Sequence, residues 1–255
     1  MDRFRDLGAE TRDAVCPTHG AFESRQIVGR IWSSCPQCES ERQAARDAER
    51  ARINAERREL ERRRLIDLAS IPARFVGKGF DNFVADTDAK RHALTVVRDF
   101  AEQFEDNAKA GKGLILSGLP GTGKSHLAGA ALQALLPRDV RYMTCLDLIR
   151  AVRETWRRDS EKTEGQVLRY LERLDLLVID EVGVQYGTDG EQTVLFEVLD
   201  RRYREVKPTI LLTNQDKAGF KVFVGERTFD RLAETCRWVP FDWASYRPQA
   251  RKEAA

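Results

Sequence analysis

The stretch GLILSGLPGTGKS, residues 113–125, decides the fold. It opens with an aliphatic run typical of a buried strand, and GLPGTGKS fits the G-x-x-x-x-G-K-[ST] spacing of a P-loop. In a P-loop the glycines let backbone N–H groups turn toward the phosphates, the lysine offsets their charge and the final hydroxyl binds magnesium. The stretch therefore predicts a site for ATP and Mg²⁺. The residues expected to contact the nucleotide are Gly118, Pro120, Gly121, Thr122, Gly123, Lys124, Ser125 and His126.

Two apolar runs further along the chain end in polar residues that complete this site. LDLLVID, residues 174–180, ends in Asp180 and is followed by Glu181. In P-loop ATPases such an aspartate orders Mg²⁺ together with the P-loop hydroxyl, and the glutamate polarises the attacking water. TILLT, residues 209–213, is followed by Asn214, which is placed to touch the γ-phosphate or the water. Paired acids also cap helices and Asn also forms turns, so these roles depend on the P-loop upstream.

The region from Pro72 to about Pro248 alternates short β-rich runs with amphipathic helical stretches. This alternation predicts an α/β fold with a parallel sheet. The expected strands are residues 113–117, 140–144, 174–180 and 209–213, and the expected helices are residues 125–136, 146–157 and 192–206.

Residues 39–65 are rich in Ala, Glu and Arg and contain no Gly or Pro. Pairs of Glu and Arg at i,i+3 and i,i+4 favour a long, solvated helix, which we expect Pro72 to end. Nine arginines against seven acids make it mildly basic. A spacer, a partner-docking arm and a DNA contact all remain open as its role.

The amino-terminal region holds two Cys-x-x-Cys/His pairs, Cys16 with His19 and Cys35 with Cys38. Four such ligands suit structural zinc with no open coordination position, whereas iron–sulfur ligation by this set is less usual. Unmetallated thiols beside a surface histidine are the plainer alternative. Residues 1–38 are too few to bury a core, so we expect this module to need the metal to fold. Its AFESRQIVGRIW segment, residues 21–32, suits either protein or nucleic-acid binding.

Composition sets outer limits on function. With 43 Lys plus Arg against 41 Asp plus Glu, the net charge of +2 makes no global case for a nucleic-acid partner. No secretory signal and no apolar run near the ~18 residues needed to cross a bilayer is visible, so we expect a cytoplasmic protein without a membrane partner. Cys145 and Cys236 are expected to pack in the core, and His92 and His126 have no ligand-like neighbours for a metal.

The order of P-loop, DE-ended strand and Asn-ended strand resembles the AAA+ ATPases. The tail, GERTFDRLAE (residues 225–234) and VPFDWASYR (residues 239–247), is similar to that of the DnaC helicase loaders and their phage or prophage relatives. IPARFVGKGFDNF, residues 71–83, and DEVGVQYGT, residues 180–188, belong to the same resemblance. The transposition helper ATPase IstB shares much of this pattern, so the motifs define the DnaC/IstB group better than one member.

The resemblance implies roles for three arginines. Arg231 would be the arginine finger that reaches into a neighbouring subunit's site, Arg227 the second candidate, and Arg247 the sensor 2 residue for the ATP of its own subunit. A planar guanidinium offsets the charge that spreads over the γ-phosphate in the transition state. Only about 40 residues follow Asn214, whereas typical AAA+ proteins carry a sizeable helical lid there.

The resemblance also implies a function and a layout. The protein is expected to load a replicative hexameric helicase onto single-stranded DNA as an ATP-assembled oligomer, gripping the helicase through its amino-terminal region. Trp156, Arg157, Arg158 and Tyr186 are candidates for the DNA path. The alternatives are an IstB-like transposition helper that remodels target DNA, and a zinc-bearing DNA-binding module in which ATP only switches affinity. The expected parts are a zinc module (1–38), a charged helical arm (39–70) and an AAA+ domain with a short lid (71–255).

Overall fold

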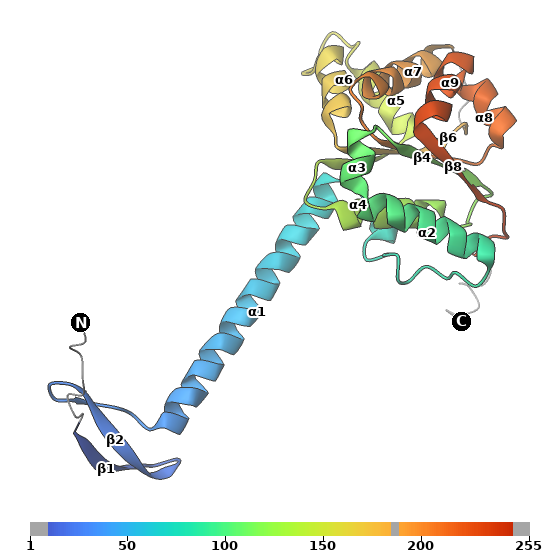
Figure 1. Ribbon diagram of the computed structural model, residues 1–255. Helices are drawn as coiled ribbons and strands as arrows, with labels where there is room; N and C mark the ends of the chain where they lie inside the picture. Colours follow the sequence, from blue (N-terminus) through green and yellow to red (C-terminus); the bar gives the residue numbers. More distant parts are fainter. Residues whose placement is uncertain (1–9, 185–188, 247–255) are drawn as a thin grey trace, which may run out of the picture. The chain divides into compact units, whose positions relative to one another are not determined.

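The computed structural model describes residues 10–184 and 189–246 (Figure 1). The chain divides into two compact units, Met1–Glu61 and Arg62–Ala255, and the long helix α1 (Pro36–Leu68) contains the boundary. Among the described residues, no helix combines the length and the apolarity needed to cross a membrane.

The first unit contains a small antiparallel sheet that the sequence patterns did not predict. Its strands are β1 (Thr11–Cys16), β2 (Gly20–Val28) and β3 (Ile31–Trp32), in the order β1-β2-β3. Within the described part of this unit, only Cys16, Ser24 and Cys35 are buried. Two thiols and a hydroxyl make no hydrophobic core, so burial of apolar side chains cannot be what holds these strands together.

Helix α1 is longer at both ends than the predicted residues 39–65. It stops at Leu68, before Pro72, because Ser70 adopts a left-handed conformation with φ of 53°. The N–H of Ile71 donates to the carbonyl of Ile66 at 3.3 Å, and the N–H of Ser70 donates to the carbonyl of Asp67 at 3.0 Å. These two bonds form a Schellman C-cap, with Ser in the place that Gly usually takes.

The second unit is built on a five-stranded sheet in the order β5-β6-β7-β4-β8, with every neighbouring pair parallel. The predicted parallel α/β fold is thus confirmed. The strands are β4 (Gly113–Gly118), β5 (Val140–Thr144), β6 (Leu176–Val182), β7 (Thr209–Thr213) and β8 (Cys236–Phe241). Strand β8 was not predicted; its exposed Pro240 is tolerated because β8 is an edge strand.

Helices cover both faces of this sheet (Figure 1). Residues of β4 alternate between the two faces, with Leu114 and Leu116 in one apolar core and Ile115 in the other. The first core includes α2 (Asp88–Glu102) and α4 (Lys124–Leu135). The second includes α5 (Cys145–Glu154), α6 (Glu164–Arg173), α7 (Asp189–Arg204), α8 (Lys217–Val224) and α9 (Glu226–Thr235). The short helices η1 (Ala73–Phe75) and α3 (Phe104–Lys109) complete the unit.

The predicted helices exist but their ends shift. The helix expected over residues 146–157 is α5, which ends at Glu154, and the helix expected over residues 192–206 is α7, which begins earlier at Asp189. Cys145 is fully buried in the core as expected, and burial raises the pKa of its thiol to about 12.

Candidate functional site

The loop between β4 and α4 has backbone conformations that require glycine. Gly118 has φ of 150° and Gly123 has φ of 100°. A Cβ at Gly118 would lie 2.4 Å from the carbonyl oxygen of Phe241, and one at Gly123 would lie 2.6 Å from Cε2 of Phe83. Any side chain would therefore clash at both positions, and the loop would lose its conformation.

Lys124 lies inside this loop with only 6% of its surface exposed. Its Nζ donates to the carbonyls of Gly118 at 2.6 Å and Leu119 at 3.0 Å. It also donates to Oδ1 of Asn214 at 3.0 Å. Two residues 90 positions apart in the chain are thus brought together, because the parallel strands β4 and β7 finish at the same edge of the sheet.

Ser125 and Asp180 also meet at this edge. The Ser125 hydroxyl donates to Oδ2 of Asp180 at 2.8 Å, and the backbone N–H of Glu181 donates to Oδ1 at 2.7 Å. A hydroxyl and a carboxylate are hard oxygen donors of the kind that hold Mg²⁺ in nucleotide sites, so these two residues fit the predicted cation.

Tyr142 is a member of the site that the sequence did not reveal. Its hydroxyl, on β5, donates to the same Oδ2 of Asp180. Burial, with the charge of Asp180, raises the pKa of Tyr142, so the phenol remains a proton donor. In the register of β5 and β6, Tyr142 lies two residues before Thr144, which pairs with Asp180, but the sequence carries no signal of this pairing.

Glu181 is exposed and has a left-handed backbone, with φ of 61°. The pairing of β6 with β7 is irregular between Ile179 and Val182, which places Glu181 in a bulge. The hydroxyl of Thr213 donates to the carbonyl of Val182 at 2.7 Å, which fixes the residue that follows Glu181 in this bulge. A strained non-glycine residue is costly, and such residues gather at functional sites.

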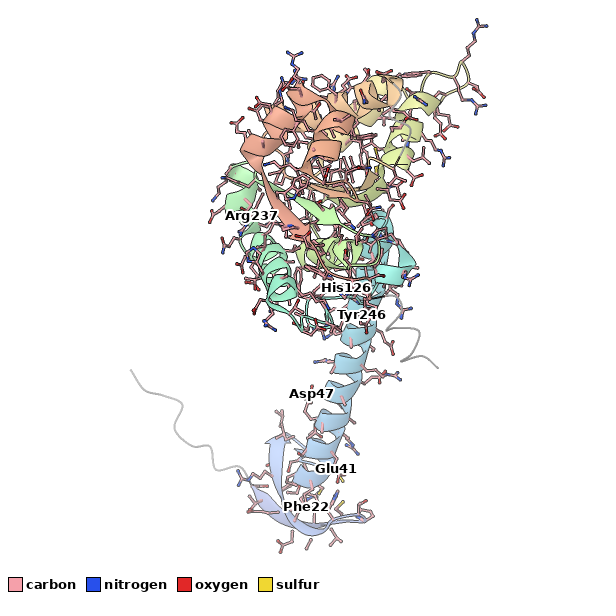
Figure 2. All side chains as sticks on the ribbon, turned by 90° about the vertical axis from the view of Figure 1, so that its right-hand side faces the viewer. Phe22, Glu41, Asp47, His126, Arg237 and Tyr246 are labelled. Carbon is pink, nitrogen blue, oxygen red and sulfur yellow. The ribbon has the colours of Figure 1, made fainter. Side chains whose placement is uncertain are left out.

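His126, labelled in Figure 2, contacts residues of the segment before α2 through its side chain. Its Nε2 lies 2.9 Å from the carbonyl of Gly79, and its ring contacts Phe83 edge-on at 5.4 Å. Burial lowers its pKa. With the ring engaged there, the group that His126 offers to a phosphate is its backbone N–H in the first turn of α4.

The predicted arginine finger lies away from the P-loop of its own chain. Arg231, on α9, forms an ion pair with Asp200 of α7, and its guanidinium lies over the rings of Phe196 and Tyr203 at 5.6 and 5.4 Å. Arg227 is exposed, 5.9 Å from the same Phe196 ring.

Arg231 also lines a small cavity together with Gly111, Thr209 and Cys236. Thr209 and Cys236 begin their strands, so this is the amino-terminal edge of the sheet, whereas the P-loop is at the carboxyl edge. Two other predicted site residues, Tyr186 and Arg247, lie outside the described residues.

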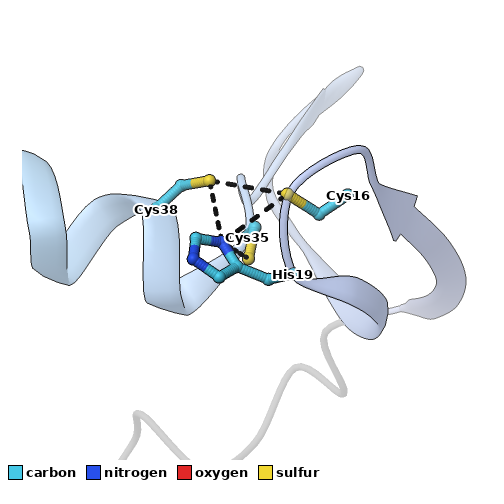
Figure 3. Close-up of side chains that lie close together, drawn as sticks. All are labelled: Cys16, His19, Cys35 and Cys38. Atoms are coloured by element: carbon cyan, nitrogen blue, oxygen red, sulfur yellow. Dashed lines mark hydrogen bonds between the residues drawn. The ribbon is translucent and has the colours of Figure 1, made fainter.

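The four predicted metal ligands converge in the first unit (Figure 3). All four ligand atoms of Cys16, His19, Cys35 and Cys38 lie within 4.8 Å of one another. The Sγ of Cys16 is 3.5 Å from that of Cys38, and Nδ1 of His19 is 3.3 to 3.8 Å from the three sulfurs. Ligand atoms around tetrahedral zinc are separated by ~3.3–3.8 Å, so this donor set fits zinc.

Neighbouring groups act differently on the members of this set: the thiolate is favoured at Cys16, whereas hydrogen bonding to Cys16 raises the pKa of the Cys38 thiol to about 11 and also raises the pKa of His19. Backbone N–H groups of His19 and Thr18 lower the pKa of the Cys16 thiol to about 6, which favours the thiolate. Nε2 of His19 lies 3.0 Å from a carboxylate oxygen of Glu41. A carboxylate on the outer ring nitrogen orients a histidine ligand and fixes its tautomer, which leaves Nδ1 for the metal.

A glycine loop running into a helix, with Lys124, Asp180 and Asn214 gathered at the carboxyl edge of a parallel sheet, defines a P-loop nucleoside-triphosphate-binding protein. The model of the IstB-like ATP binding protein family matches residues 47–254, and the chain belongs to this family, within the DnaC/IstB group of AAA+ proteins.

Named relatives agree with this placement. The replicative helicase loader DnaC of Escherichia coli K12 is 35% identical over 200 residues, covering 77% of this chain and 80% of the relative. The DnaC of Buchnera aphidicola subsp. Schizaphis graminum is 32% identical over 202 residues, covering 78% and 81%.

Solved structures show the same fold. A crystal structure of the DnaC helicase loader superposes with a TM-score of 0.59 at 24% identity, covering 66% of this chain and 98% of that one. AMPPCP-bound DnaA from Aquifex aeolicus gives a TM-score of 0.57 at 22% identity, covering 72% and 55%. The α/β fold expected for the core is therefore confirmed.

Proposed function

We propose that this protein is an ATPase that loads a replicative DNA helicase onto single-stranded DNA and acts as an ATP-assembled oligomer. The observation that carries the proposal is the convergence of Lys124, Ser125, Asp180 and Asn214 at one edge of the sheet, in a chain whose relatives are DnaC loaders.

In this mechanism the amides of the P-loop and Lys124 bind the β- and γ-phosphates. Ser125 and Asp180 would hold Mg²⁺, which when bound would supply positive charge to offset the charge on the phosphates. Glu181 and Asn214 orient the attacking water. An arginine from the next subunit completes the site, so bound ATP holds neighbouring subunits together. Hydrolysis of the ATP then sets when the helicase is released.

Replacing Glu181 by glutamine is expected to lower kcat for ATP hydrolysis by about 10²–10⁴-fold, because the amide cannot accept a proton from water. The Kd for Mg·ATP, measured by calorimetry, should stay close to the wild-type value, since Lys124, Ser125 and Asp180 are unchanged. Glu161→Gln, in the exposed stretch between α5 and α6, is the control and should retain full turnover. An unchanged kcat in Glu181→Gln would remove Glu181 from the mechanism.

The single-stranded DNA is proposed to follow the loop between α5 and α6. Trp156 in this loop is 59% exposed, and Arg157 and Arg158 beside it are exposed as well. An exposed indole stacks on bases and guanidinium groups hold phosphates, so this loop suits an unpaired strand.

A loading assay tests the proposed function. The full-length protein with Mg·ATP is expected to bind the purified hexameric helicase of its host and to transfer it onto a single-stranded DNA circle. Lys124→Ala should bind the helicase poorly or fail to release it. If the wild-type protein with ATP does not bind the helicase at all, the loader proposal is wrong.

The family match also favours a second candidate, an IstB-like transposition helper. Such a protein would bind and remodel target DNA for a transposase, and it would bind duplex DNA in the presence of ATP with no helicase present. If ATP only switched affinity for DNA, Glu181→Gln would still release its partner. The loading and release assays therefore separate all three functions.

A further inference from the structure

The segment that follows β8, residues 242–246, is hydrogen-bonded to the P-loop at two successive residues. The indole Nε1 of Trp243 donates to the carbonyl of Thr122 at 2.9 Å. The backbone N–H of Tyr246, labelled in Figure 2, donates to the carbonyl of Gly121, also at 2.9 Å. The proposed mechanism gives neither donor a role.

These bonds fix the direction of two peptide planes in the loop. In a trans peptide the C=O of one residue and the N–H of the next point in opposite directions. Because the carbonyls of Gly121 and Thr122 point toward residues 242–246, the amides of Thr122 and Gly123 point away from that segment. Among the described residues, neither of these amides has a hydrogen-bond acceptor. They are thus left open as donors, which is what a phosphate-binding nest requires.

Both partners in the Trp243 contact are held in place by other interactions. The ring of Trp243 packs on that of Phe241, with centroids 4.8 Å apart, and is partly buried against the first core of the sheet. Thr122 is 2% exposed, and its hydroxyl donates to the carbonyl of Leu119 at 2.8 Å. The indole N–H of Trp243 is therefore a donor in a fixed position, and the P-loop residue that accepts from it is also held in place.

We propose that Trp243 is a positioning residue: with the Tyr246 amide, it orients the P-loop amides toward the triphosphate before ATP arrives. This rests on the proposed ATP site. Preorganisation of this kind increases affinity, because the loop is already ordered before ATP binds and binding carries no entropic cost of ordering it. ATP affinity is then set partly by residues 242–246, some 120 positions from the loop in the chain.

Trp243→Phe is the test, because it keeps an aromatic ring next to Phe241 while it removes the N–H donor. It also replaces the two-ring indole by a single ring, a loss of volume that the control below shares. The loss of one hydrogen bond is expected to raise the Kd for Mg·ATP about 2- to 12-fold. In steady-state hydrolysis KM should rise by a similar factor with kcat nearly unchanged, since the groups around the γ-phosphate remain.

Trp238→Phe is the matched control. Trp238 lies on β8 and packs against Phe220 in the second core, with ring centroids 5.6 Å apart. This variant removes an indole N–H from β8, the strand just before Trp243, without touching the P-loop, so its Kd for ATP should equal that of the wild type. A thermal unfolding scan of both variants without nucleotide detects any general loss of folding.

A second pair of variants tests the backbone donor. Tyr246→Pro and Tyr246→Ala both remove the phenol, but only proline removes the N–H. The proline variant should therefore bind ATP about 2- to 12-fold more weakly than the alanine variant.

The outcomes separate this proposal from the function on which it rests. If Trp243→Phe binds ATP as tightly as the wild type, or if Trp238→Phe weakens binding equally, the positioning role is wrong while the ATPase stands. If the wild-type protein binds no ATP, the ATPase itself is refuted.

Discussion

Replacing Arg231 by alanine is expected to lower ATP turnover of the assembled protein by about 10³–10⁵-fold, the range found for arginine fingers. Each subunit should still bind Mg·ATP, because the P-loop is intact. The reason is electrostatic: with no guanidinium from the next subunit, charge on the γ-phosphate oxygens in the transition state has no cationic partner opposite Lys124. Single-turnover hydrolysis and calorimetric binding, measured on the same sample, separate the two effects.

If Arg231 is the finger, its position means that it would act on the ATP of a neighbouring subunit. It lies with Thr209 and Cys236 at the amino-terminal edge of the sheet, while the P-loop follows β4 at the carboxyl edge. Mixing Arg231→Ala subunits with Lys124→Ala subunits should therefore restore part of the activity. In the mixture a Lys124→Ala subunit supplies its arginine to the intact P-loop of an Arg231→Ala subunit.

Arg204→Ala provides the matched control, because Arg204 pairs with the same Asp200, at 3.1 Å, without being a finger candidate. Its turnover should stay near wild type. If Arg204→Ala lost as much activity as Arg231→Ala, the ion pair with Asp200 would be supporting the fold of α7 and α9 and not catalysis. If the mixture stayed inactive while Arg227→Ala subunits complemented Lys124→Ala, the finger would be Arg227.

The parts of the fold that the sequence predicted are those written in local patterns. Aliphatic runs identified β4, β5, β6 and β7, because a strand buried on both faces is apolar throughout. Strand β8 was not predicted, because Arg237 and Pro240 interrupt its apolar pattern; such residues are tolerated in a strand at the edge of a sheet. Strands β1 and β2 were not predicted either. Neither face of their sheet packs on a core, so their sequences do not alternate between apolar and polar residues.

The residues of the candidate site also fall into two groups, those that local sequence patterns predict and those that they do not. Lys124, Asp180 and Asn214 each follow a recognisable strand, so their meeting could be predicted from the rule that parallel strands end together. Tyr142 and Trp243 could not be found in this way. Tyr142 reaches Asp180 from 38 positions away and Trp243 reaches Thr122 from 121 positions away, and no periodicity in the sequence records such a contact. The ion pair that holds Arg231 against Asp200 was missed for the same reason.

Removal of zinc is expected to unfold β1, β2 and β3 while leaving the second unit folded and able to bind ATP. Among the described residues of the first unit only Cys16, Ser24 and Cys35 are buried, so we expect bound zinc to supply nearly all the free energy that holds these strands. Structural zinc supplies about 10–16 kcal/mol in small modules of this kind. Hydrogen exchange of residues 11–32 should lose its protection after chelation and regain it when zinc is added back.

Cys38→Ser should reproduce the effect of the chelator, because Cys38 is one of the four ligands and serine is a poor zinc donor. Cys236→Ser, which changes a thiol far from the cluster in the chain, should leave the zinc content and the exchange of residues 11–32 unchanged. Since the expected helicase contact lies in the amino-terminal region, chelation should also abolish helicase binding while the Kd for ATP stays constant. Purified protein without stoichiometric zinc, but with protected strands, would show that the thiols and His19 hold the fold by themselves.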